Sequence, residues 1–227
     1  MRTAVCISGF LRACEASYES LNKFIFERFK PDIFISTWDQ DGQAGQLQKT
    51  AVDMYRPKAI EIQSWPEVLA SWGDLAELDK RKRADVTVAN VLGMFYKIYR
   101  SNQLKRAAES SAGVRYDAVV RLRTDLLFYD APDLRGIIPG YVAIGNTFGY
   151  GGLPDLFAYG DSGSMDVYSD LFPRIRSYVN EGCIFHPEIL LEWHTKRALP
   201  QGVVFSNVPF RLNKPTGASG PNVWCIR

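Results

Sequence analysis

The spacing of hydrophobic residues changes repeatedly along the first half of the chain, and each change predicts a strand or a helix. The apolar runs 3–8 (TAVCIS) and 32–37 (DIFIST) predict two strands. Helical spacing separates them, in Tyr18, Leu21, Ile25 and Phe29. Two near-continuous apolar strands joined by a helix are typical of a right-handed βαβ unit in a parallel sheet with both faces covered. The pattern therefore predicts an α/β fold.

Hydrophobic spacing predicts further strands and helices in the rest of the chain. Further strands are expected at 59–63, 117–123, 141–144 and 155–159. A long amphipathic helix is expected from Val88 to about Glu109, another after a cap at Ser162 or Ser164, and a third at Pro187. The polar or glycine-rich segments 39–48 and 145–152 are expected to be loops, and the chain after Phe205 an extended tail.

Composition agrees with a globular domain and excludes several classes. The chain has 227 residues, of which 46% are hydrophobic and 23% charged, which suffices for a real core. A net charge of +2 gives no overall field for nucleic acid. The cysteines form no CxxC pair and no Gly-x-Ser-x-Gly elbow is present, which disfavours structural zinc and a serine hydrolase. With no signal peptide or membrane span visible, a cytoplasmic location is expected.

Ligands of open α/β sheets bind beyond the carboxyl ends of the strands, so the residues that follow each expected strand are candidate site residues. The first group is Ser8, Gly9 and Arg12, in SGFLR. Gly9 permits close backbone approach, the next helix offers its amino end to a phosphate, and Arg12 adds positive charge. The alternative is a turn that needs Gly9 only for its geometry. The segment is neither GxGxxG nor a Walker A sequence.

Charged residues gather where the strand 117–123 ends. Arg121, Arg123 and Asp125 stand at alternate positions, so their side chains are expected on one side. A carboxylate beside two guanidinium groups favours a metal-bound diphosphate, because Mg²⁺ needs few carboxylates when phosphate oxygens and water complete its shell. The alternative is a buried Arg–Asp ion pair.

Two further places carry groups that could move protons. Asp155 opens the strand expected at 155–159, and either it or the nearby Asp161 could be a base. Glu188 lies between His186 and His194 at the start of the last helix. The alternative for each histidine is a satisfied polar group with a structural role.

Seven segments, taken together, carry a resemblance to a known family. They are SGFLR (8–12), PDIFISTW (31–38), YRPKAIEI (55–62), MFYKIY (94–99), VVRLRTDLLF (119–128), DLFAYGDSGSMDVYSDLF (155–172) and HPEILLEWH (186–194). Their order and spacing resemble GT-A-like glycosyltransferases of bacterial capsular polysaccharide and lipopolysaccharide biosynthesis, a fold that viral glycan-building enzymes share. The resemblance implies a mostly parallel central sheet flanked by helices on both faces, and transfer of a sugar from a nucleotide-sugar donor to a glycan acceptor.

The resemblance also implies a site. In the GT-A pattern a DxD motif holds Mn²⁺ or Mg²⁺ and the donor diphosphate, but the matching place reads Arg123-Thr124-Asp125, so Arg123 could supply the positive charge directly. Mn²⁺ or Mg²⁺ is still expected, with Asp125 and His194 as ligands. Asp155 or Glu188 is expected to be the catalytic base. Donor contacts are expected from Ser8, Gly9, Arg12, Arg121, Arg123, Asp125, Arg211 and Lys214.

One domain is expected over 1–227, with a nucleotide-binding part at about 1–130, an acceptor and catalytic part at 131–205, and a tail or lid at 206–227. Arg211 and Lys214 would meet phosphate when the tail closes. Expected partners are a UDP- or GDP-sugar and a glycan or glycolipid acceptor, with no nucleic acid and no membrane span. The alternative activities are a nucleotidyltransferase, or a non-catalytic glycan-binding or scaffold domain.

Overall fold

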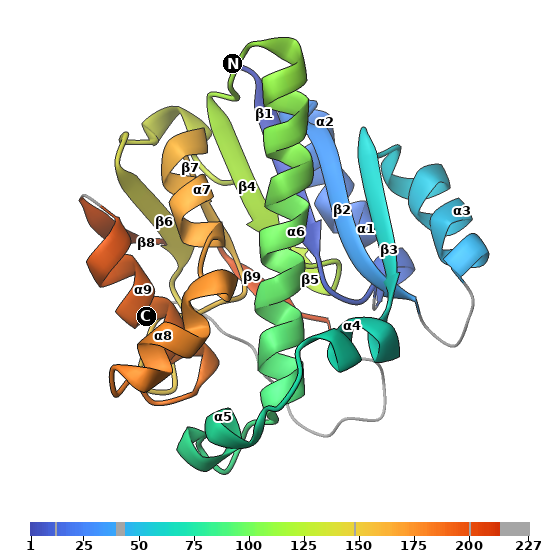
Figure 1. Cartoon of the computed structure of the whole chain (residues 1–227). Helices are drawn as coiled ribbons and strands as arrows, with labels where there is room; N and C mark the ends of the chain where they lie inside the picture. The colour runs from blue at the N-terminus through green and yellow to red at the C-terminus, as the bar shows by residue number, and fades with distance from the viewer. Residues whose placement is uncertain (12, 40–43, 148, 200, 214–227) are drawn as a thin grey trace.

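A computed structural model describes residues 1–11, 13–39, 44–147, 149–199 and 201–213 (Figure 1). The strands are β1 (Thr3–Ser8), β2 (Asp32–Asp39), β3 (Ala59–Ser64), β4 (Ala118–Leu122), β5 (Leu126–Phe128), β6 (Tyr141–Gly145), β7 (Ala158–Gly160), β8 (Gly202–Ser206) and β9 (Phe210–Leu212). The α-helices are α1 (Cys14–Leu21), α2 (Glu27–Phe29), α3 (Ala44–Tyr55), α4 (Trp65–Ser71), α5 (Ala76–Arg81), α6 (Val88–Ala112), α7 (Ser162–Ser169), α8 (Ile175–Asn180) and α9 (Pro187–Ala198).

The central sheet has seven strands in the order β3-β2-β1-β4-β7-β6-β8. Strands β3, β2, β1 and β4 are parallel, β7 is antiparallel to both its neighbours, and β8 is parallel to β6. The chain builds β2 and β3 on one side of β1, then returns through α6 to place β4 on the other. This reversal of strand order is the place where open α/β sheets bind their ligands.

Both faces of the sheet are buried because residues along each strand alternate between two hydrophobic clusters. In β1, Ala4 and Cys6 join the cluster of α6 to α9, whereas Val5 and Ile7 join the cluster of α1 to α3. Figure 1 shows α6 crossing one face of the sheet while α1 and α2 lie behind it. The predicted mostly parallel sheet with helices on both faces is confirmed.

Helix α6 is the longest helix and carries polar residues inside the protein. It ends where Gly113 adopts a φ of +65°, a left-handed conformation that glycine allows without strain. Its buried polar residues are Lys97, Ser101, Asn102, Lys105 and Glu109. Among the described residues no helix is long and apolar enough to cross a membrane.

Three local predictions are wrong. Helix α3 begins at Ala44, inside the segment expected to be a loop, because packing of its Ala51 and Tyr55 in the core overrides a polar, glycine-containing sequence. Strand β7 begins at Ala158 rather than at residue 155. The cap of α7 is Asp161, whose carboxylate accepts hydrogen bonds from two backbone N–H groups of the first turn.

The chain near and beyond Phe205 is also more ordered than expected. Strand β8 pairs with β6 at the edge of the sheet, and β9 pairs with β5 in a separate two-stranded sheet. Phe210 of β9 is buried against the rings of Phe128 and Phe157. The prediction of an extended tail is therefore wrong for β9, because cross-strand pairing and a buried aromatic contact hold it in place.

Candidate functional site

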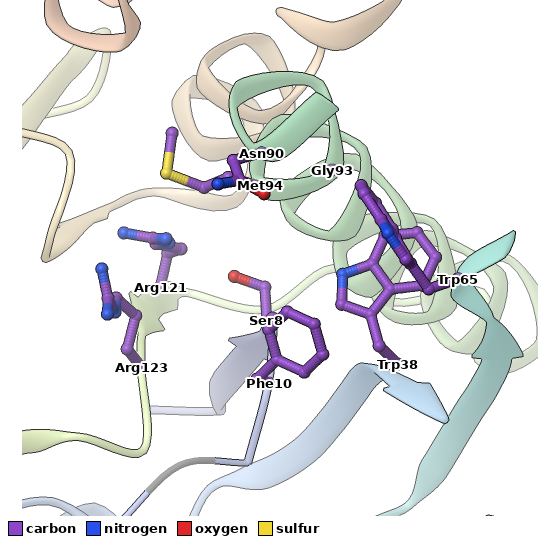
Figure 2. Close-up of a pocket in the computed structure, with 10 residues that line it drawn as sticks. Ser8, Phe10, Trp38, Trp65, Asn90, Gly93, Met94, Arg121 and Arg123 are labelled. Atoms are coloured by element: carbon purple, nitrogen blue, oxygen red, sulfur yellow. The ribbon is translucent and has the colours of Figure 1, made fainter. Parts of the chain in front are cut away.

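A cavity of about 250 Å³ opens beside the carboxyl ends of β1, β2 and β4 (Figure 2). Ser8 and Arg121 point into it because they stand two positions beyond Cys6 and Val119, whose side chains pack in the cluster with α6. The lining residues are Ser8, Gly9, Phe10, Trp38, Trp65, Asn90, Gly93, Met94, Arg121 and Arg123. The cavity thus occupies the predicted ligand position, where β1 lies between β2 and β4.

Two arginines form the cationic end of the cavity. Arg121 is 1% exposed, donates a hydrogen bond to the backbone carbonyl of Asp155, and leaves its Nε without a partner among the described residues. Burial lowers its pKa. Arg123 donates from Nε and Nη2 to the two oxygens of Asp125, at 2.9 and 2.6 Å. The alternative of an Arg–Asp ion pair is therefore observed, but it involves only one of the two arginines.

The residues after β1 lie where the sequence predicts. Ser8 is buried, and its Oγ has no hydrogen-bond partner among the described residues. Gly9 adopts a φ of +96° and donates its N–H to the carbonyl of Ser36 at 3.1 Å, which continues the pairing of β1 with β2 by one residue. Figure 2 shows the guanidinium groups at one end of the cavity and the tryptophan rings at the other, with Ser8 between them. Arg12 lies outside the described residues.

Aromatic rings line the end opposite the arginines, and no pattern in the sequence predicted them. The rings of Trp38 and Trp65 meet edge to face with centroids 4.8 Å apart. Gly93 of α6 makes room for this arrangement, because a Cβ there would lie 2.5 Å from the Trp65 ring. Trp38 could have been found from its place near the end of β2, whereas Trp65 and Gly93 come together only through packing.

Lys97 supports this aromatic wall from inside the protein. Its side chain is fully buried, with Nζ 3.9 Å from the centroid of the Trp38 ring, a cation–π distance. The amine donates a hydrogen bond to Gln63 Oε1 at 2.8 Å. Burial lowers the pKa of Lys97 to about 7, against a smaller opposing effect of Glu61. The Lys97 ammonium therefore loses its proton at a lower pH than an ordinary lysine does.

The two candidate bases have different surroundings. Asp155 is tied to Arg121 through its own carbonyl, and its carboxylate makes no hydrogen bond or ion pair among the described residues. Glu188 is 7% exposed and accepts a hydrogen bond from the backbone N–H of Tyr150, in the glycine-rich loop. Burial raises the pKa of Glu188 to about 7, and the charge of Asp155 adds to this rise. Among the described residues the carboxylate of Asp155 therefore has no partner, whereas that of Glu188 binds the backbone of the glycine-rich loop.

The residues expected to bind metal do not form a ligand set. Both nitrogens of His194 already have partners, the Tyr178 hydroxyl at 2.9 Å and the Val167 carbonyl at 2.7 Å. Both oxygens of Asp125 bind Arg123. In the part of the chain that the structure describes, no three His, Cys, Asp or Glu side chains are grouped to hold an ion. Asp125 and His194 therefore do not fit a resident Mn²⁺ or Mg²⁺. The hydrogen bonds of His194 agree with the alternative prediction, a satisfied polar group with a structural role.

The expected phosphate contacts from the tail have no support within the described residues. Arg211 lies in β9 opposite Leu127 and does not line the cavity. Lys214 lies outside the described residues. The backbone N–H of Asn213 donates to the carbonyl of Asp125 at 2.7 Å. Asn213, the residue after β9, therefore lies close to Asp125, and closure of the tail over a ligand stays a prediction.

Comparisons with known proteins identify the fold. No protein-family model matches the chain, and no curated protein matches it in sequence. Among solved structures, the chain is similar to mouse xyloside xylosyltransferase 1 in its apo form, with a TM-score of 0.50 and 9% sequence identity. The match covers 91% of this chain and 84% of that chain. At this identity the likeness concerns the fold alone, and with the sheet order above it confirms the predicted GT-A-like fold class.

Proposed function

We propose that the protein is a glycosyltransferase that transfers a sugar from a UDP- or GDP-sugar to a hydroxyl of a glycan or glycolipid. The observation that carries the proposal is the two-ended cavity beside β1. Its arginine end suits an anionic diphosphate, and its aromatic end suits the flat face of a base or the apolar face of a sugar. The resemblance to capsular polysaccharide and lipopolysaccharide enzymes and the GT-A-like fold support the same reaction class.

Charge development during sugar transfer assigns roles to the arginines. As the bond from the anomeric carbon to the diphosphate breaks, negative charge grows on the leaving phosphate. Arg121 and Arg123 stand at the cavity before the reaction, so their orientation costs little reorganisation when that charge develops. Donor binding and leaving-group stabilisation would thus use the same two groups.

The acceptor hydroxyl needs a base if the anomeric configuration is inverted. Asp155 suits this role better than Glu188, because its carboxylate makes no hydrogen bond within the described part of the chain and its backbone carbonyl accepts one from Arg121. Glu188, with its pKa near 7, would keep the glycine-rich loop in place on the acceptor side. Whether the configuration is inverted or retained does not alter the donor site.

The proposal is tested by nucleotide binding followed by turnover. Thermal unfolding is measured with UDP, GDP, CDP and their sugar conjugates, and release of nucleoside diphosphate is then followed with the conjugate that binds. A ligand at 100 times its Kd should stabilise the protein by about 2.7 kcal/mol. We expect Asp155→Asn to keep donor binding and lose turnover, and Asp53→Asn, an exposed carboxylate on α3, to keep both.

The outcomes separate the alternatives. Binding and turnover that survive in Asp155→Asn would remove the base role from this residue. Transfer of a nucleotidyl group, seen as release of pyrophosphate, would favour a nucleotidyltransferase. Glycan binding without nucleotide binding would favour the non-catalytic domain.

A further inference from the structure

We infer that this site binds the diphosphate of its donor with arginine side chains and without a divalent cation, and that Asp125 positions Arg123 instead of ligating a metal. The inference rests on the proposed function and specifies how its donor is recognised. It departs from the metal predicted by resemblance to the DxD pattern.

The geometry of Asp125 favours a guanidinium partner over a metal ion. Its two oxygens accept one hydrogen bond each from Arg123, in the parallel two-bond arrangement that fixes a guanidinium in orientation as well as in position. Its side chain is only 14% exposed. A cation at Asp125 would have to displace Arg123 from at least one oxygen, and no group of three His, Cys, Asp or Glu side chains is present among the described residues to hold it. The donor set therefore suits a guanidinium and not a metal.

Two buried donor groups at the cavity lack an acceptor among the described residues. Arg121 is fully buried, has no ion pair among the described residues and leaves Nε unpartnered. Ser8 Oγ is buried beside the same cavity and is also unpartnered within the described chain. A buried donor that lacks an acceptor is costly, so an acceptor-rich ligand at this end is strongly favoured. Phosphate oxygens are acceptors only and match both guanidinium and hydroxyl groups.

The charges at the arginine end of the cavity favour an anionic ligand. Arg121 and Arg123 bring two positive charges to the cavity, and Asp125 neutralises one of them. Arg121 is left as a buried cation that forms no ion pair with any described residue, although the charges of Asp155 and Asp125 act on it. A divalent cation would add repulsion at this end, whereas a diphosphate supplies the missing counter-charge. The local charge therefore selects an anion directly.

Calorimetric titration of the full chain tests the inference, with inorganic pyrophosphate, UDP, GDP and CDP as probes. Each titration is done in EDTA and again with Mn²⁺ or Mg²⁺. The variants are Arg123→Gln and Asp125→Asn. Arg106→Gln is the matched control, because Arg106 of α6 does not line the cavity and forms an exposed pair with Asp170, the residue after α7. Urea unfolding of each variant confirms that it is folded. Arg121 is left unchanged, since loss of a buried arginine could prevent folding.

We expect the Kd of the probe that binds to agree within about twofold between EDTA and metal. Arg123→Gln should weaken binding by about tenfold or more, because a hydrogen bond to a charged group is lost. Asp125→Asn should change Kd by no more than about threefold, and Arg106→Gln should leave it unchanged. If Asp125 acts only through Arg123, Asp125→Asn should have no further effect in the Arg123→Gln background, whereas a general structural role would add to it.

The contrary results are distinct from one another. Binding that requires metal, or that is lost in Asp125→Asn and kept in Arg123→Gln, would overturn the inference and leave the proposed function standing. Pyrophosphate binding in EDTA with no turnover of any nucleotide sugar would do the reverse. Absence of binding by every probe, with or without metal, would overturn both.

Discussion

The two buried lysines of α6 have opposite surroundings. Lys105, toward the carboxyl end of the helix, contacts two carboxylates, Asp166 at 2.7 Å and Glu109 at 2.9 Å, and also donates to the Ser162 hydroxyl. Lys97, nearer the cavity, has a neutral amide oxygen and the Trp38 ring as its neighbours, and burial lowers its pKa to about 7. Lys105 is therefore a cation with carboxylate partners, whereas Lys97 is a buried amine whose charged form is disfavoured.

Polar groups near Lys105 and polar groups near the cavity also differ in how completely they are hydrogen-bonded. Near Lys105 the polar groups belong to a connected network that joins α6 to α7, which also includes Arg115. Near the cavity, Ser8 and Arg121 have donor atoms without partners among the described residues. Stability is thus concentrated at one end and binding capacity at the other, as expected when a rigid scaffold presents a site.

Lys105→Met gives the largest expected effect, because it leaves buried Glu109 without its cation and leaves partly buried Asp166 with Arg115 alone. We expect a loss of about 3–5 kcal/mol in the free energy of unfolding, measured with urea. The neighbouring Arg106→Gln breaks only an exposed pair and should change stability by less than about 1 kcal/mol. A loss in Lys105→Met as small as that of the control would show that the network does not hold α7 in place.

Gly93→Ala tests the cavity end. The new Cβ would lie 2.5 Å from the Trp65 ring, so the ring must shift and the cavity must change shape. We expect a loss of about 1–3 kcal/mol in stability and weaker nucleotide binding, in spite of the better helix propensity of alanine. Gly45→Ala in α3, where no described atom outside the helix backbone and the neighbouring residues lies within 4 Å of the new Cβ, should be neutral or stabilising. Equal effects at both positions would contradict the role of Gly93.

Lys97→Met should alter the pH dependence of stability. The folded pKa near 7 lies below the unfolded value of 10.5, so between these values the unfolded state binds more protons and stability rises with pH. From about pH 7.5 to 9 this amounts to roughly 2 kcal/mol in the native protein, and the variant should lack it. Urea unfolding at several pH values measures the difference, and parallel curves for the two proteins would refute it.

Glu188→Gln gives the smallest effect and the opposite sign. The folded pKa near 7 exceeds the ordinary value of 4.5, so the folded state binds more protons between them and stability falls as pH rises. We expect a fall of about 1 kcal/mol from roughly pH 5.5 to 6.5, which the variant should lack. An unchanged fall in Glu188→Gln would assign it to other groups.

The sequence by itself determined the alternation of strands and helices and the edge of the sheet at which the site lies. Hydrophobic spacing is local, and a strand with both faces apolar has few alternatives to a covered parallel sheet. Ser8, Gly9, Arg121 and Arg123 were found for this reason, since the end of a strand can be read from the chain alone. The start of helix α3 and the strand β9 were not predicted, because their stability comes from contacts with elements that are distant in the sequence.

Only the tertiary structure decided which partners the charged groups have. Arg123, Arg121 and Asp125 stand at alternating positions, and the sequence allowed either a metal–diphosphate site or an ion pair among them. In the structure Arg123 pairs with Asp125. Arg121 instead donates a hydrogen bond to the carbonyl of Asp155, which lies in the loop between β6 and β7. Likewise, Trp65 reaches the cavity because Gly93 lacks a side chain. Hydrogen bonds and close packing depend on distances of a few ångströms between remote segments, and hydrophobic spacing does not encode these distances.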